Sequence, residues 1–398
     1  MKKHFFSGGF FIILMSLIFS SSIGLAATPE PIRVGRIDCF TGFLEYMAKE
    51  TQRGFELGIQ YATNGTNKIN GRPIEIIKED SQLNPQIARQ KALKLIDQDK
   101  VHFLVGAVSS TDTLALQPLA GKEKVPLIVT GATATSITGA NWNKYTFRVN
   151  RNNLQDAITW GYALGAPGLK VALLAEDTAA GHEGMDALKK VLVQKGSKLV
   201  YEAYAPHTTT DFTPILQKIV AAKPAFCALW WAGANSPWNQ MIETFKPANI
   251  KISTSTLDIA HLALYLNVTD RLGRLFCLYY YDISKNPIND WLIKNYQAAY
   301  GMPPTYSTEV GMAGAILMCE ALKKTNGNTD PDALVAAMEG LKFETAKGTR
   351  IMRAEDHTAL QEMYVVHVVK KEGTKWAIPI LDIRLTPEET APPILNKR

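Results

Sequence analysis

The chain alternates between short apolar runs typical of strands and longer segments with helical spacing, and this order occurs twice. The apolar runs span residues 32–37, 73–79, 101–106 and 125–129 in the first half, and 170–175, 199–205, 226–231, 250–256 and 275–281 in the second. Between most of these runs, apolar residues recur at the spacing of one helix face. Strands that alternate with helices form parallel sheets covered on both faces. The sequence therefore predicts an α/β protein with two halves, each built on a parallel sheet.

Two such halves enclose a cleft, and ligands of open α/β sheets bind beside the carboxyl ends of the strands. We expect the chain to cross between the halves at residues 148–153, again near residue 281, and a third time near Arg353, Asp356 and His357. These crossings predict how the chain is shared between the lobes. The first lobe is expected to contain residues 28–150 and 282–355, and the second residues 151–281 and 356–398.

The N-terminus has the pattern of a secretory signal peptide. Lys2 and Lys3 precede an apolar core at residues 10–19, and small residues suited to cleavage follow at 24–27. The apolar core is too short to span a bilayer. We therefore expect residues 1–27 to be removed on export and the mature chain to be periplasmic, with no lipid anchor because no cysteine stands at the cleavage site.

Composition narrows the class of protein further. About 370 residues would remain after cleavage, which suits two domains, and the net charge of +6 would fall to about +4. Because basic residues form no run, nucleic-acid binding is not expected. The four cysteines form no CxxC pair, and we expect buried thiols; they are Cys39, Cys227, Cys277 and Cys319. No GxGxxG, P-loop, GxSxG or HExxH pattern occurs, so no cofactor or metal is expected.

The stretch at residues 101–115 carries the main site signal. An apolar run ends in Gly106, Ser109 and Ser110 follow, and Asp112 stands where a capping box would place its acid. A helix that begins here presents free N–H groups and a positive dipole end to an anion. Thr133 follows the next strand and brings a second hydroxyl to the same edge. The alternative is that the serines only cap the helix.

At this point the residues show a family resemblance, carried by the order and spacing of motifs over nearly the whole mature chain. These are Thr41-Gly42, the segments 54–58, 69–73 and 79–80, 106–110, 126–133, 147–148 and 211–215, and the helix near 306–322. The chain resembles the periplasmic leucine/isoleucine/valine-type binding proteins of ABC importers. That resemblance implies two Rossmann-like lobes joined by a three-crossover hinge, the type I periplasmic binding protein fold. It also implies that Ser110, the backbone of Gly131 and Thr133 hold a ligand carboxylate, with Ser109 beside them.

The second lobe departs from the amino-acid pattern of the family. Ala180 stands where the family often has an aromatic residue, and His182 follows at the same loop. Trp230 or Trp231 represents the family aromatic at the end of the third strand, and only one of them can face the cleft if the strand continues that far. Asp258 is the candidate acceptor for a ligand ammonium. A hydrophobic amino acid is the first choice of ligand, and an aromatic or other carboxylate without an amine is the alternative.

Three functions fit this sequence. The first is the solute-binding protein of an ABC importer, a monomer that captures a small carboxylate and delivers it to a membrane permease. The second is an enzyme on the same lobes, for which no nucleophile–base or cofactor motif is present. The third is the same receptor module feeding a signalling partner.

Overall fold

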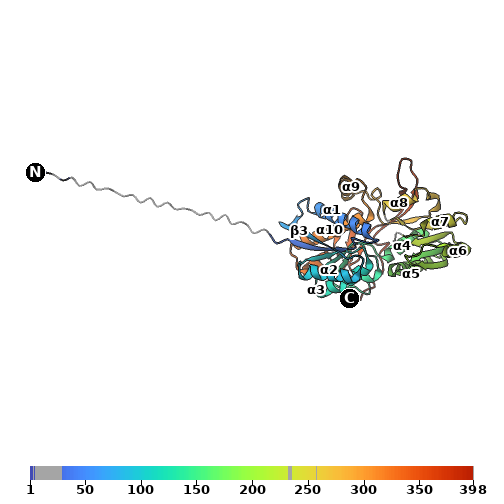
Figure 1. Cartoon of the computed structure of the whole chain (residues 1–398), viewed down its shortest axis with the longest axis horizontal. Coiled ribbons are helices and arrows are strands. Elements are labelled where there is room, and N and C mark those ends of the chain that lie inside the picture. The colour runs from blue at the N-terminus through green and yellow to red at the C-terminus, as the bar shows by residue number, and fades with distance from the viewer. Residues whose placement is uncertain (3, 5–28, 232–234, 257, 398) are drawn as a thin grey trace.

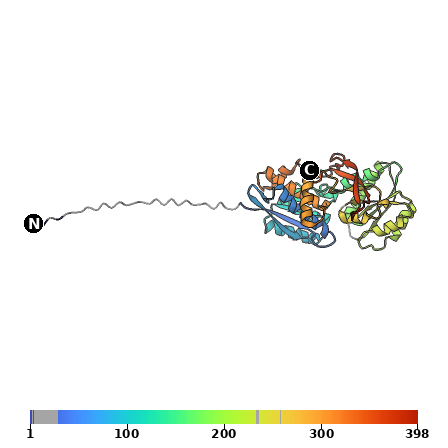
Figure 2. The same cartoon turned by 90° about the horizontal axis from the view of Figure 1, so that it is seen from above.

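The computed structural model describes residues 1–2, 4, 29–231, 235–256 and 258–397, and it shows two α/β lobes side by side (Figure 1). Most of the predicted signal peptide lies outside the described residues. One lobe carries helices α1, α2, α3 and α10, and the other carries α4 to α8. The C-terminal residues end near the junction of the two lobes, as the second view also shows (Figure 2).

The first lobe is built on a six-stranded sheet in the order β2-β3-β1-β4-β5-β6, parallel except for the β2–β3 pair. Its strands are β1 (Ile32–Asp38), β2 (Lys68–Ile69), β3 (Arg72–Asp80), β4 (Phe103–Val105), β5 (Leu127–Val129) and β6 (Thr146–Arg148). Alternating residues of β5 face opposite layers: Ile128 joins the cluster with α1 and α10, whereas Leu127 and Val129 join the cluster with α2 and α3. This is the covered parallel sheet that the sequence predicts.

The helices of this lobe include segments from both ends of the chain. They are α1 (Glu45–Ala62), α2 (Pro85–Asp97), α3 (Ser110–Glu123), α9 (Pro287–Tyr300), α10 (Tyr306–Lys324) and α11 (Pro331–Met338). Helix α10 packs directly on α1, so residues after 300 lie against the first sheet. The contact requires glycine, because a Cβ on Gly54 would lie 1.9 Å from the carbonyl oxygen of Thr308 and one on Gly58 would lie 2.7 Å from the Cβ of Ala315.

The second lobe has two sheets. The four-stranded parallel sheet runs β10-β9-β7-β8, and a second sheet runs β11-β12-β16-β17. Its elements are α4 (Asn153–Leu164), β7 (Lys170–Glu176), α5 (Ala179–Gln194), β8 (Lys198–Ala205), α6 (Thr213–Ala222), β9 (Phe226–Trp230), α7 (Trp238–Phe245), β10 (Lys251–Ser253), β11 (Ser255–Thr256), α8 (Ile259–Tyr265), β12 (Leu275–Cys277), β16 (Met363–Val369) and β17 (Ile378–Leu385). The apolar run at 250–256, predicted as one strand, therefore divides between two sheets.

Several local predictions were wrong or missing. Helix α5 begins at Ala179, because the Thr178 hydroxyl accepts from the Gly181 N–H and caps it, whereas the helical spacing predicts a start at Gly184. Helix α4 was not predicted, and only its first residue, Asn153, lies in the expected crossing at 148–153. The sequence also gave no sign of the small sheet formed by β13 (Lys342–Thr345), β14 (Gly348–Met352) and β15 (Ala359–Leu360). All four cysteines are buried free thiols, as predicted.

The junction between the lobes is unusually polar. The N–H of Arg148, at the first crossing, donates to the carbonyl of His357 at the third. Beside this bond lie two buried ion pairs, Arg151 with Asp156 at 3.2 Å and Arg350 with Glu309 at 2.7 Å. Such pairs fix a geometry without adding much stability, since desolvation offsets most of the attraction.

Lys347, between β13 and β14, is a buried cation at this junction that is hydrogen-bonded to an amide instead of a carboxylate. It is 2% exposed, and its ammonium bonds to Gln361 Oε1 at 3.1 Å and contacts the Met363 sulfur, while the Glu309 carboxylate attracts it from beyond ion-pair distance. Burial lowers the pKa of Lys347 from 10.5 to about 7, with Arg350 adding repulsion. The folded protein therefore disfavours the charged form of this side chain.

We predict that Lys347→Met stabilises the protein near pH 7 by about 1–4 kcal/mol, because it removes a buried charge whose desolvation outweighs the attraction of Glu309. Between pH 7 and 10.5 the unfolded chain binds the Lys347 proton more strongly than the folded chain, so this lysine makes wild-type stability rise with pH over that range. Denaturant unfolding at pH 6, 7.5 and 9 measures both effects. The exposed Lys342→Met is the matched control; equal pH slopes in wild type and Lys347→Met would contradict the prediction.

Candidate ligand-binding site

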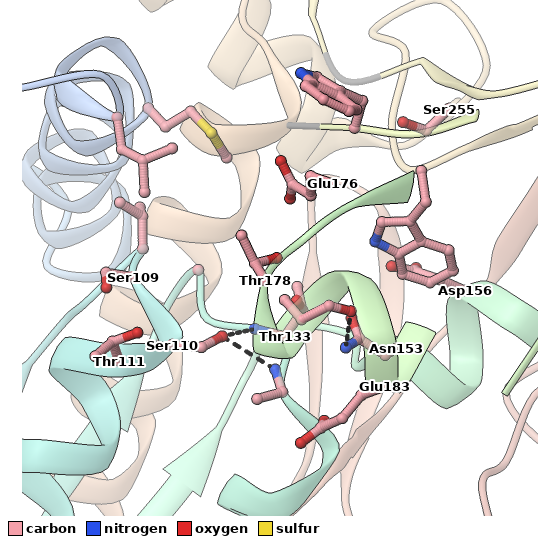
Figure 3. Close-up of a pocket in the computed structure, with 18 of the residues that line it drawn as sticks. Ser109, Ser110, Thr111, Thr133, Asn153, Asp156, Glu176, Thr178, Glu183 and Ser255 are labelled. Atoms are coloured by element: carbon pink, nitrogen blue, oxygen red, sulfur yellow. Dashed lines mark hydrogen bonds between the residues drawn. The ribbon is translucent and has the colours of Figure 1, made fainter. Parts of the chain in front are cut away.

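A cavity of about 340 Å³ lies between the lobes, at the carboxyl ends of strands from both parallel sheets. Figure 3 shows Ser109, Ser110 and Thr111 on one side of it and Asp156 and Ser255 on the other. Pockets of this size accept small-molecule ligands. The cavity therefore occupies the place where the two-lobe topology predicts a site.

The first-lobe wall is organised by two serines at the start of α3. The Ser109 hydroxyl accepts from the Asp112 N–H at 3.2 Å and is the N-cap. The Ser110 hydroxyl instead reaches across to the loop after β5, where it accepts from the N–H groups of Thr133 and Ala134, both at 3.2 Å (Figure 3). Capping thus accounts for one serine, and the other joins two strand-end loops beside the positive end of a helix dipole.

The loop after β5 is held from behind as well. Asn150 Nδ2 donates to the carbonyl of Gly131 at 2.6 Å, and Arg148 Nη1 donates to the carbonyl of Ala134 at 2.6 Å. Gly131 must be glycine, since a Cβ there would lie 2.6 Å from the Cα of Val108. These bonds fix the backbone that faces the cavity before any ligand arrives.

The second-lobe wall is aromatic at its base. Trp160 lies 5.7 Å from the ring of Trp230 and 4.9 Å from that of Phe276, and its indole N–H donates to Ser253 Oγ at 2.7 Å. Trp230 rests on Gly184, where a Cβ would lie 2.3 Å from the indole. These rings give the cavity a fixed apolar face.

Charged groups are confined to the second-lobe side of the cavity. Asp156 pairs with Arg151, and burial raises the pKa of Asp156 despite that partner. Glu176, at the end of β7, lines the cavity and is 5% exposed, with His207 Nδ1 3.6 Å from its carboxylate. Figure 3 shows the Glu176 carboxylate directed into the space between the walls.

Two contacts cross the cleft. The Glu183 carboxylate on α5 accepts from the Thr135 N–H of the first lobe at 2.7 Å. At the cleft edge the ring of Phe43 lies 5.3 Å from that of His207. Both contacts connect the two lobes beside the cavity, so the lobes touch each other in this structure.

Comparison with known proteins places this architecture in a family. A family model described as a periplasmic binding protein matches residues 31–374. The chain belongs to the periplasmic binding protein family.

Individual relatives agree with this assignment. A crystal structure from Rhodopseudomonas palustris CGA009, described as an ABC-type branched-chain amino acid transporter, is 38% identical, covers 92% of this chain and 100% of its own, and superposes with a TM-score of 0.83. A solute-binding protein of an ABC transporter from Rhodopseudomonas palustris BisB5, in complex with 3,4-dihydroxybenzoic acid, is 27% identical over 90% of this chain and 98% of its own, with a TM-score of 0.77. The Leu/Ile/Val-binding protein homolog 6 of Brucella suis biovar 1 is 24% identical over 91% of this chain and 93% of its own.

These relatives confirm the predicted resemblance and the type I periplasmic binding protein fold. Solute-binding proteins of ABC transporters bind small ligands and work with membrane permeases. In the part of the chain that the structure describes, no helix is long and apolar enough to cross a membrane.

Six of the residues that the sequence singled out line the cavity of this periplasmic binding protein: Ser109, Ser110, Gly131, Thr133, Ala180 and Trp231. Trp230 lines it too. Strand alternation would have allowed only one of the two tryptophans, but β9 ends at Trp230, so the alternation ends there as well.

The other two candidates lie elsewhere. His182 stacks on Tyr204 with ring centroids 4.0 Å apart and bonds to Asp177 at 2.7 Å. Asp258 caps α8 by accepting from the His261 N–H at 2.9 Å and borders a separate small hollow with Tyr279 and Thr305. The structure therefore does not bring them to the cavity with the other six.

Sequence reasoning missed several polar cavity residues, of which Arg151, Asn153, Asp156 and Glu176 are buried and Thr178 and Glu183 are half-buried. One signal was available. Asn152 and Gln155 form a capping box, which marks the start of α4 and would have placed Asn153 and Asp156 at a helix start beside the cleft. Nothing local distinguishes Glu176 or Glu183 from surface acids.

We predict that Glu183→Ala weakens lobe closure, because it removes the acceptor that the Thr135 N–H uses across the cleft. Ligand affinity should fall roughly 5–10-fold, as for the loss of about one hydrogen bond, and the ligand-saturated protein should keep a larger radius of gyration. Small-angle scattering and calorimetry measure the two effects. Asp186→Ala, an exposed acid on the same helix, is the control; closure equal to wild type in Glu183→Ala would exclude this role.

Proposed function

We propose that this chain is the periplasmic solute-binding protein of an ABC importer and that it captures a small carboxylate by clamshell closure. The protein acts as a monomer, without turnover of its ligand, and delivers that ligand to a membrane permease. Closure would occur about the three crossings, with residues 28–150 and 282–355 moving against 151–281 and 356–398. A ligand that contacts both lobes favours the closed state.

The observation that carries this proposal is the state of the Ser110 hydroxyl. Its oxygen already accepts from two backbone N–H groups, so both lone pairs are occupied. The remaining O–H proton has no acceptor recorded among the described residues, and the group lines the cavity at the start of a 14-residue helix. A hydroxyl in this state needs an acceptor, and a carboxylate supplies one that the helix dipole also favours.

We predict that Ser110→Ala and Thr133→Ala each lower affinity roughly 10–100-fold, the effect of losing a charge-assisted hydrogen bond of about 1.5–3 kcal/mol. The probe is whichever of leucine, phenylalanine, benzoate and cinnamate stabilises the wild type most in a thermal-shift screen, and calorimetry gives the affinities. The exposed Ser236→Ala is the control. Unchanged affinity in both variants would remove these hydroxyls from the site.

Glu176 supports a hydrophobic amino acid as the ligand. A buried ammonium needs an acceptor, and an unpaired one is costly. Asp258 lies outside the cavity, whereas the Glu176 carboxylate lies inside it, on the wall opposite Ser110. A carboxylate held at the first lobe and an ammonium held at Glu176 would let an amino acid bridge the two lobes.

A carboxylate without an amine is the second candidate, and the aromatic base of the cavity favours it. Trp230 and Phe276, backed by the buried ring of Trp160, form a surface on which a ring can pack. Ala180 leaves open a position where a larger residue would stand. The relative in complex with 3,4-dihydroxybenzoic acid supports the same candidate, since it shares 27% of its sequence over 90% of this chain.

Glu176→Gln separates the two candidates. If Glu176 holds an ammonium, the variant should weaken leucine and phenylalanine roughly 10–100-fold while leaving 4-methylpentanoate and 3-phenylpropionate nearly unchanged, since it removes a charge and keeps the shape. Calorimetry with these matched pairs measures the difference, with Glu202→Gln outside the cavity as the control. If the wild type binds only 4-methylpentanoate and 3-phenylpropionate and neither amino acid, the ligand is a carboxylate without an amine, and the proposed transport role is unaffected.

A further inference from the structure

A group of apolar side chains on the first lobe is only partly covered by the protein. Leu44 and Met47 come from the start of α1, Leu83 from the loop after β3, and Leu114 from α3. Three of them form a small cluster with Val108, separate from the main core of the lobe. All of them line the cavity, beside Ser109 and Ser110 and across from the aromatic base.

The cavity is larger than a leucine-sized ligand needs. A cavity of about 150 Å³ lined by apolar side chains holds one benzene. The cavity between the lobes, at about 340 Å³, therefore has room for roughly two benzene-sized groups, on the order of twelve non-hydrogen atoms. Leucine and benzoate each have about nine, so either would leave part of the first-lobe apolar wall against water.

The arrangement of walls shows where additional atoms would lie. The carboxylate position at Ser110 and Thr133 is between two apolar surfaces, the aromatic base on the second lobe and the Leu44–Met47–Leu83–Leu114 wall on the first. Covering the second surface removes apolar area from water, which is favourable in proportion to the area. A ligand long enough to extend beyond the aromatic base would cover this first-lobe apolar wall.

We propose that Leu44, Met47, Leu83 and Leu114 form an apolar subsite for the extended tail of the ligand, which is an unbranched or aryl-substituted monocarboxylate of about eight to ten carbons. This inference rests on the proposed carboxylate site at Ser110 and extends it. The subsite selects by tail length, whereas Glu176 selects by the presence of an amine.

Two homologous series test the proposal on the intact protein, refolded from denaturant to remove any copurified ligand. One is butyrate, hexanoate, octanoate and decanoate; the other is 2-aminobutyrate, norleucine and 2-aminooctanoate. In whichever series binds, affinity should rise roughly fourfold for each methylene through the eight-carbon member. A plateau at hexanoate or norleucine would overturn the subsite. Failure of every acid, including leucine and benzoate, would instead overturn the carboxylate site itself.

Variants locate the effect. Met47→Gln and Leu114→Gln keep the side-chain length and helix propensity but remove the apolar surface, so they should cut the gain between the six- and eight-carbon acids from roughly sixteenfold to less than fourfold. The thermal unfolding midpoint of each ligand-free variant, compared with that of the wild type, shows whether it folds. Leu264→Gln, at a residue 56% exposed on α8, is the matched control. An undiminished gain in both variants would place the tail elsewhere and overturn the assignment.

Discussion

The site depends on the hydrogen bonds that the Ser110 hydroxyl accepts from the Thr133 and Ala134 N–H groups. These bonds tie the turn after β4 to the turn after β5, two loops that leave neighbouring strands of one sheet. Backbone groups at strand ends have no partner in the sheet and must find one elsewhere. Here a side chain supplies it, and the two bonds hold the first-lobe wall together, with the Ser110 proton left for the ligand acceptor that we propose.

Buried charged side chains gather where the chain crosses between the lobes, and the bond from Arg151 to the Tyr306 hydroxyl spans the two. Arg148, Arg151, Glu309 and Arg350 are almost fully inaccessible, and each holds partners from distant segments. Ion pairs of this kind contribute little to stability, since desolvation opposes them. They specify geometry instead, because charges that lose their partners in a dry interior are costly. Charges held this way leave few alternative arrangements where the chain crosses between the lobes.

The cavity separates its tasks by lobe. The first lobe provides neutral donors and a helix dipole, the second provides carboxylates and aromatic rings, and Glu183 and Phe43 connect the two across the opening. Because residues of both lobes line the cavity, a ligand held there would contact both lobes.

The sequence by itself determined the α/β class of both lobes and indicated six of the residues that line the cavity. Strand and helix periods are local, so the alternation of residues 32–129 and 170–281 fixed the covered parallel sheets, and hydroxyls placed directly after strands, such as Ser110 and Thr133, had to meet at one sheet edge. The sequence did not predict the start of α4 or the short strands β13 to β15, which have no clear hydrophobic period. Which acids face the cavity was decided only by tertiary structure: Glu176 and Glu183 point into it while Asp258 caps a helix. That choice depends on how two lobes, distant in sequence, are set against each other, and no local pattern records it.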